Sequence, residues 1–179
     1  MPPGLKEVDP TKVHRFFYPS VPAVLCAAHN GRVSAMPVTS CIPLSEIPPV
    51  VGVSCNPQAF TFLLASRSRL FSLCILDRSR ASAIEFLATH SGRVSLDKLA
   101  DAGLGWVRGA SLDVPVIKGS QAVLECSLVS KRRFGDHLLV VGKVEGASAS
   151  ADFKDYWQFK TYHPVLYTGW QGRMTTYTG

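Results

Sequence analysis

Residues 121–144 read QAVLECSLVSKRRFGDHLLVVGKV, and this stretch decides the fold. It holds two apolar runs rich in valine and leucine, residues 121–129 and 137–144, on either side of Phe134-Gly135-Asp136. Runs of this composition are typical of strands, and a short glycine-containing connection between two of them is typical of a hairpin. The stretch therefore predicts two long strands paired as a hairpin.

Four shorter apolar runs precede this hairpin. Asn30-Gly31 separates the first two, and Asn-Gly between strand-like runs is a strong hairpin signal. Pro37 interrupts the second run, which indicates an edge strand or an irregular loop because proline cannot donate to a ladder. Six strands in total are therefore predicted. The shorter runs span residues 23–28, 33–37, 50–55 and 70–76.

Few helices connect these runs. Asn56-Pro57 indicates a helix start, with asparagine as the N-cap and proline at the first helical position. Ser82 and Glu85 can form a capping box for a second helix that ends near residues 90–92, and a short third helix is expected over residues 96–102. Many strands with few helices favour a β-barrel over a doubly wound sheet.

Composition predicts one globular domain over residues 1–179, with residues 1–13 and 152–179 as peripheral segments. Apolar residues make up 46% of the chain and charged residues 18%, which excludes a disordered protein. No apolar run approaches the roughly 18 residues that a membrane span needs. The first residues, MPPGLKEVDP, lack the apolar core of a signal peptide. We therefore expect a cytoplasmic protein without a membrane partner.

The cysteines indicate neither a disulfide framework nor a metal site. Their number is odd, and no pair has the CxxC spacing. Four of them lie in strand-like apolar runs, which is typical of buried thiols in a reducing compartment. These four are Cys26, Cys55, Cys74 and Cys126, and the fifth is Cys41.

The formal charge of +6 suits an anionic partner. The densest basic run, Lys131-Arg132-Arg133, is interpreted as the solvated end of the hairpin. A nucleic-acid surface would interleave aromatic and basic residues, whereas the aromatic residues here gather near the two ends of the chain. A ligand that carries phosphates is the alternative that the charge favours, and no nucleic-acid partner is expected.

Five short motifs follow one another between His14 and Tyr167. In this order they resemble the flavin reductase-like, FMN-binding family. The resemblance implies a mainly β fold, a six-stranded split β-barrel of Greek-key type with a few short helices. It also implies a homodimer with FMN at the edge of the subunit interface. The motifs are FYP at 17–19, GRVSAMP at 31–37, PPVVGVS at 48–54, PVI at 115–117 and GDHLLVVGKV at 135–144.

A flavin ring needs an apolar slot with a few polar groups for its carbonyls. The segment at 38–41 offers small side chains, hydroxyls and free amides between two prolines. Taken alone it is an ordinary loop rich in serine and threonine, but the resemblance places it along the flavin ring. Its residues are Val38, Thr39, Ser40 and Cys41.

A phosphate is suited to the amides and hydroxyls at a helix N-terminus. The resemblance implies that Ser54, Asn56 and Thr61 help to hold the ribityl phosphate, although Asn56 could be a plain N-cap. Some family members carry a basic residue where this chain has Gln58-Ala59. The phosphate charge must then be balanced elsewhere.

Three basic residues are candidates to balance the negative charge of the phosphate. They are Arg67, Arg93 and Lys98. The stretch HSGR at 90–93, with Asp97-Lys98, resembles a second segment of several family members. Arg93 could equally be a solvated loop residue.

Gly135-Asp136-His137 is the clearest polar motif. The resemblance gives His137 a catalytic part, in binding nicotinamide or in positioning the flavin ring. The structural alternative is a surface pair between His137 and Asp136, which would be worth little. Histidine can donate a hydrogen bond near neutral pH.

The leading function is reduction of FMN by NADH or NADPH, with electrons passing on to a free flavin, iron or a protein acceptor. The first alternative is a non-enzymatic FMN electron carrier like flavoredoxin, and a basic nucleic-acid-binding barrel is the second. Long apolar strands with few helices to cover them indicate burial by a second subunit, and the aromatic segment at 157–170 could wrap onto that subunit.

Overall fold

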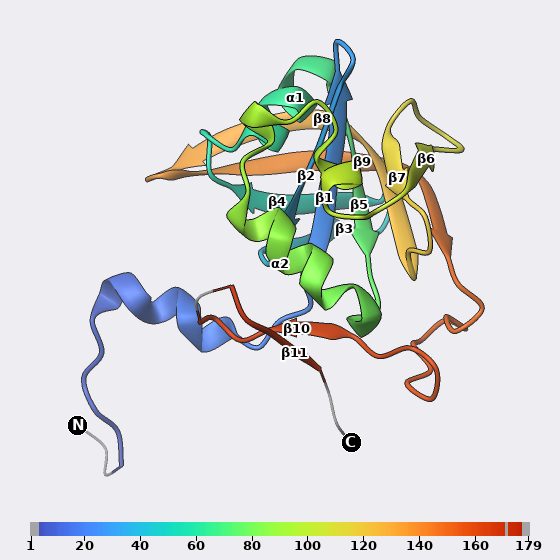
Figure 1. Cartoon of the computed structure of the whole chain (residues 1–179). Coiled ribbons are helices and arrows are strands. Elements are labelled where there is room, and N and C mark those ends of the chain that lie inside the picture. Colours follow the sequence, from blue (N-terminus) through green and yellow to red (C-terminus); the bar gives the residue numbers. More distant parts are fainter. Residues whose placement is uncertain (1–3, 171, 177–179) are drawn as a thin grey trace.

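The computed structural model describes residues 4–170 and 172–176. Its centre is a seven-stranded antiparallel sheet in the order β2-β1-β5-β8-β9-β4-β3 (Figure 1). Residues of β1 and β4, which lie near opposite edges of this order, share one buried core, so the sheet is rolled into a barrel. The strands are β1 (Ala23–His29), β2 (Arg32–Val38), β3 (Cys41–Ser45), β4 (Val50–Cys55), β5 (Leu70–Ile75), β8 (Ala122–Phe134) and β9 (His137–Ala149).

The predicted long hairpin is confirmed. Strands β8 and β9 have 13 residues each, and Phe134 pairs with His137 across the turn. Gly135 has φ of 59°, a left-handed conformation that glycine adopts without a steric penalty. Both strands extend beyond their predicted ends. Two register shifts between β8 and β9 bend the hairpin without ending the pairing. The Asn30-Gly31 hairpin between β1 and β2 is confirmed as well.

The prediction of six strands in the main sheet was wrong by one, because β3 forms in a stretch where no strand was predicted. Pro43 pairs with Val51 of β4, and β3 is the last strand of the sheet. An edge strand tolerates proline because only one of its sides needs donors. Two small two-stranded sheets are additional, β6 (Trp106–Arg108) with β7 (Pro115–Ile117) and β10 (Val165–Tyr167) with β11 (Met174–Thr176).

The first α-helix begins later than Asn56-Pro57 predicted. Helix α1 (Phe60–Ser68) starts after a turn in which the Asn56 side chain accepts a hydrogen bond of 2.8 Å from the Gln58 amide. Asparagine favours such a turn because its side chain substitutes for a backbone acceptor. The capping-box prediction was also wrong. Helix α2 (Ala81–Thr89) has no side-chain cap, and Glu85 accepts from the Met174 amide at 3.1 Å instead.

The remaining helices are short. Helix α3 (Lys98–Asp101) is capped by Asp97, and three 3₁₀ segments complete the set. The 3₁₀ segments are η1 (Pro10–Phe17), η2 (Arg78–Arg80) and η3 (Gly92–Val94). No helix within residues 4–170 and 172–176 is long and apolar enough to cross a membrane.

Alternation along β1 divides the protein into two cores. Ala23, Leu25 and Ala27 face the barrel interior, where α1 also packs. Val24 and Cys26 face outward and are covered by α2, α3 and β7. This two-sided burial explains why β1 has no polar residue before its last position.

The four cysteines expected to be buried are buried, and all five thiols are free. Burial raises the pKa of the Cys55 and Cys126 thiols to about 12, so both remain protonated and unreactive near neutral pH.

The segments near the two ends of the chain lie close to each other. Figure 1 shows η1 and the β10–β11 hairpin next to each other at the bottom of the view. Ser20 pairs with Tyr167, which joins the two segments. Val165 is buried in the core that lies outside the barrel, between β1 and the covering elements α2, α3 and β7. The C-terminal segment thereby comes to lie near the end of α2.

Candidate functional site

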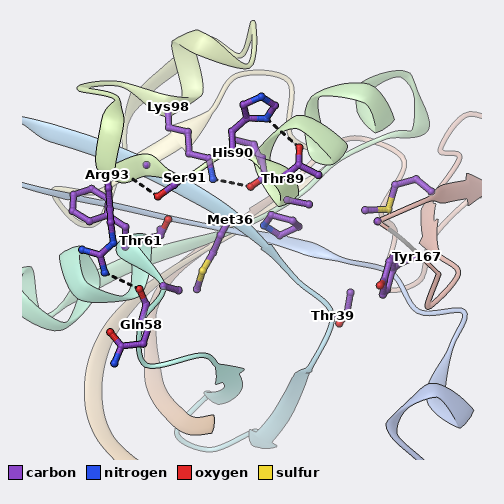
Figure 2. A pocket seen from close by; sticks show the side chains of 18 of the residues that line it. Met36, Thr39, Gln58, Thr61, Thr89, His90, Ser91, Arg93, Lys98 and Tyr167 are labelled. Carbon is purple, nitrogen blue, oxygen red and sulfur yellow. Dashed lines mark hydrogen bonds between the residues drawn. The ribbon is translucent and has the colours of Figure 1, made fainter. Parts of the chain in front are cut away.

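A cavity of about 600 Å³ opens between the barrel and the C-terminal hairpin. Strand β2 forms its floor, and its walls come from the start of α1, the end of α2 with η3, and the chain near β10–β11 (Figure 2). Its lining comprises residues 36–37, 39, 58–61 and 87–93, together with Tyr18, Lys98, Tyr167, Gly172 and Met174.

One end of the cavity is cationic. Lys98 is only 4% exposed, and its ammonium donates to the carbonyls of Ala35 at 2.8 Å and Leu87 at 2.7 Å. Burial lowers the pKa of Lys98 to about 8. In the described part of the chain no carboxylate lies within ion-pair distance of it. A buried charge is costly without a partner of opposite sign, so this end is suited to an anion.

The N-terminus of α1 adds donors at the same end. Ala59 is the N-cap residue and supplies no side-chain cap. The amides of the first turn have no acceptor among the described residues, and Phe60 and Thr61 line the cavity. The Thr61 hydroxyl lies 2.8 Å from the hydroxyl of buried Ser34. Free amides and the helix dipole both favour a negative group here.

Arg93 stands beside this helix start. Its guanidinium donates to the Gln58 carbonyl at 3.0 Å and lies 5.7 Å from the centre of the Phe60 ring. The Ser91 hydroxyl accepts from the Arg93 amide at 3.2 Å and fixes the beginning of η3. Figure 2 shows Arg93, Lys98, Thr61 and Ser91 gathered at one end of the cavity.

The opposite end is aromatic and hydroxylic. Tyr18 and Tyr167 meet edge to face at 4.8 Å between ring centres, and the Tyr18 hydroxyl lies 3.3 Å from that of Thr39. Met36 lies between the two ends in Figure 2. The cavity therefore combines an apolar middle with a hydroxyl rim at one end and two cations at the other.

Four of the predicted site residues line this cavity. They are Thr39, Thr61, Arg93 and Lys98. Arg67, the third basic candidate, is in the last turn of α1 and is not among the lining residues.

The other residues of the 38–41 segment lie elsewhere, since β2 ends at Val38 and the chain enters β3 at Cys41. Val38 is buried in the barrel core, and Ser40 is exposed. Cys41 lies in β3 and packs against the barrel core, where burial raises its pKa to about 12. None of the three lines the cavity.

Ser54, Asn56 and His137 also lie outside the lining. The Ser54 amide donates to the Ser40 carbonyl, and Asn56 closes the turn before α1. His137 is at the tip of the β8–β9 hairpin, with Nδ1 2.9 Å from the Asp136 carboxylate. This hydrogen bond lowers the pKa of Asp136. Within one chain, His137 and Asp136 thus form the surface pair that the sequence offered as the alternative to a catalytic role.

Sequence reasoning missed part of the lining. Tyr167, Gly172 and Met174 come from the C-terminal segment, and nothing in the local sequence indicated that this segment returns to β2. Tyr18 belongs to the FYP motif, so a signal for it was present.

The chain resembles known proteins over most of its length. Residues 14–168 match the model of the flavin reductase like domain. An uncharacterised protein of Aeropyrum pernix is 31% identical over 92% of this chain, which spans only 63% of that relative. A reductase component of 4-nitrophenol 4-monooxygenase/4-nitrocatechol 2-monooxygenase from Rhodococcus opacus is 26% identical over 85% of this chain and 78% of its own.

Solved structures share the fold. An FMN-binding protein from Thermus thermophilus with bound p-hydroxybenzaldehyde has a TM-score of 0.83 at 29% identity, covering 97% of this chain and 94% of that chain. Flavoredoxin from Methanosarcina acetivorans has a TM-score of 0.84 at 19% identity, over 98% and 92% of the two chains, a likeness of fold alone. These likenesses confirm the predicted split barrel.

Proposed function

The chain belongs to the flavin reductase-like family, and on this premise we propose that it binds FMN and passes electrons from NADH or NADPH to a free flavin, iron or a protein acceptor. The observation that carries the proposal is the buried ammonium of Lys98, whose hydrogen-bond partners among the described residues are two backbone carbonyls, beside a helix start without a side-chain cap. The phosphate of FMN would balance the charge of this ammonium.

The cationic end fits a phosphate in charge and in donors. Lys98 and Arg93 supply positive charge, and Thr61 with the first-turn amides of α1 supplies neutral donors. Arg93 also contacts Gln58, at the place where some family members carry a basic residue, so the side chain from η3 could supply the charge that this position lacks.

The other end fits an isoalloxazine ring. Met36 and Pro37 offer an apolar surface, and the hydroxyls of Thr39 and Tyr18 can bond ring carbonyls. When bound, FMN supplies the redox chemistry by accepting a hydride from nicotinamide and releasing electrons to an acceptor. The protein binds, orients and shields the ring.

A second subunit is part of the proposal. Ile42, Leu44 and Ile47 on β3 and the turn after it are 51%, 44% and 94% exposed. Clustered exposed aliphatic side chains on an edge strand favour burial by a partner, and a second copy of the chain is the partner we infer. The buried free thiols support a reducing compartment, and we infer a cytoplasmic location.

An FMN electron carrier is the second candidate. It is favoured by His137, since the residue that the family resemblance assigns to nicotinamide lies outside the cavity in a single chain. A carrier would bind FMN equally well and would accept electrons from a protein or from dithionite, but not from nicotinamide.

One experiment separates these outcomes. Titration of the protein into FMN should quench flavin fluorescence saturably, and anaerobic NADH or NADPH should then bleach the bound flavin. As a control at the ring end, Thr39→Val should weaken FMN and riboflavin alike. Absence of quenching well above micromolar flavin would reject FMN binding, and binding without bleaching by either nicotinamide would select the carrier.

A further inference from the structure

One side chain makes three hydrogen bonds between the barrel and the η3 loop. Arg32, the first residue of β2, directs its Nη2 to the carbonyls of Gly92, Arg93 and Ser95, each at 2.8 Å. Two N–H groups are thus shared among three carbonyls of one short loop. This loop carries Ser91 and Arg93, which line the cationic end of the cavity.

The same guanidinium contacts the start of α1. It lies 4.4 Å from the centre of the Phe60 ring, and Arg93 approaches that ring at 5.7 Å. Phe60 is the first residue of α1, so Arg32 contacts both walls of the cationic end. The Nε of Arg32 is buried and has no partner among the described residues, a cost that native proteins accept only rarely.

Close packing at Gly92 reinforces this arrangement. A Cβ atom at Gly92 would lie 2.2 Å from the Ser34 hydroxyl and 3.0 Å from the Phe60 ring. Ser34 is two residues after Arg32 on β2, therefore on the same face, and its hydroxyl contacts Thr61. Strand β2 thus holds the loop through Arg32 and holds the helix start through Ser34.

We propose that Arg32 is a positioning residue that fixes the distance between Arg93 and the N-terminus of α1, and so shapes the phosphate end of the cavity. The inference rests on the proposed binding of FMN. Arg32 itself is not among the residues that line the cavity, and it acts through the loop that it binds. We call its contacts with Gly92, Arg93, Ser95 and Phe60 the Arg32 clamp.

The clamp predicts a selective defect in Arg32→Met, which keeps the hydrocarbon stem and removes every donor. The preference of the protein for FMN over riboflavin should fall by about tenfold or more, while riboflavin affinity stays within about twofold of wild type. In the ligand-free protein, backbone amides at 91–95 should exchange with deuterium faster than in wild type.

Two further variants sharpen the test. Arg69→Met is the matched control, because Arg69 also donates its Nη2 to one backbone carbonyl, that of Leu128 at 2.6 Å, outside the cavity. It should change neither the ligand preference nor the exchange at 91–95. Arg32→Lys keeps the charge, but its ammonium lies one bond closer to the backbone than Nη2 and has no guanidinium plane to face the Phe60 ring, so it should recover only part of the preference.

The possible results are distinct. Full recovery in Arg32→Lys, or unchanged exchange at 91–95 in Arg32→Met, would overturn the clamp. A wild-type protein that binds FMN and riboflavin equally would overturn the role of the clamp in phosphate binding. A wild type that binds neither flavin would reject the proposed function, and faster exchange in Arg32→Met alone would then still support the clamp.

Discussion

Replacing Lys98 by methionine tests the cationic end most sharply, because it removes the ammonium and keeps an unbranched side chain. A lowering of its pKa from 10.5 to about 8 corresponds to about 3 kcal/mol of cost for the charged form at neutral pH. Removing the charge relieves this cost, but it leaves the carbonyls of Ala35 and Leu87 without this donor, at about 1–3 kcal/mol each. The opposing effects should leave the free energy of unfolding of the ligand-free protein within about 3 kcal/mol of wild type.

Ligand binding should respond very differently. Losing a charge-assisted contact to phosphate costs about 1.5–3 kcal/mol, or roughly 10- to 150-fold in FMN affinity. Riboflavin, which lacks the phosphate, should bind the variant as it binds wild type. Calorimetric titration of both ligands measures the two effects, and Lys154→Met, which removes an exposed lysine, controls for net charge. Equal weakening of FMN and riboflavin would refute a phosphate role for Lys98.

Three other predictions concern pH, the hairpin tip and assembly. FMN affinity should be constant between about pH 7 and 8, where the phosphate is largely ionised, and should fall as pH rises further, because Lys98 with a pKa of about 8 then loses its charge. Stability of the ligand-free protein should rise above pH 8, because the folded pKa of Lys98 lies below its ordinary value. A flat titration of FMN affinity above pH 8 would contradict this. His137→Asn should preserve folding, since the surface pair of His137 with Asp136 contributes little to stability. If a second subunit brings His137 to the flavin, the variant should reduce bound FMN about tenfold or more slowly in stopped-flow measurements. An unchanged rate would assign His137 to the surface pair alone. Ile47→Lys should shift sedimentation from dimer towards monomer, because the Ile47 side chain is 94% exposed in one chain and would be buried in the dimer. A wild-type protein that sediments as a monomer at high concentration would reject the dimer.

The parts of the fold that the sequence predicted correctly are those that depend on neighbouring residues, above all the two hairpins and their turns. Asn30, Gly31 and Gly135 have left-handed backbone, a conformation that Asn-Gly and glycine favour and that tight hairpin turns between strands use. Strand β3 has only five residues and includes Pro43, which cannot donate to a ladder, and the sequence does not show that this strand lies at an edge. The start of α1 was misplaced because Asn56 suits a turn as well as an N-cap.

The site was predictable only where it follows the family motifs. Thr61 and Lys98 lie in stretches that resemble family segments, and both line the cavity. The sequence predicted residues 38–41 as one binding segment, whereas the chain passes from β2 to β3 within it and only Thr39 of the four lines the cavity. Tyr167 reaches the site through tertiary return of the C-terminal segment, and no local pattern encodes such a return. The role of Arg32 depends on carbonyls brought together in space, and residue type alone does not indicate it.

Side-by-side titration of the wild-type protein with FMN and riboflavin tests the central claim most directly, since the two ligands differ only in the phosphate. The buried ammonium of Lys98, the free amides of α1 and Arg93 predict that FMN binds at least about tenfold more tightly than riboflavin at pH 7. Equal affinity for the two flavins, or affinity for neither, would contradict the assignment of this cavity as a flavin phosphate site.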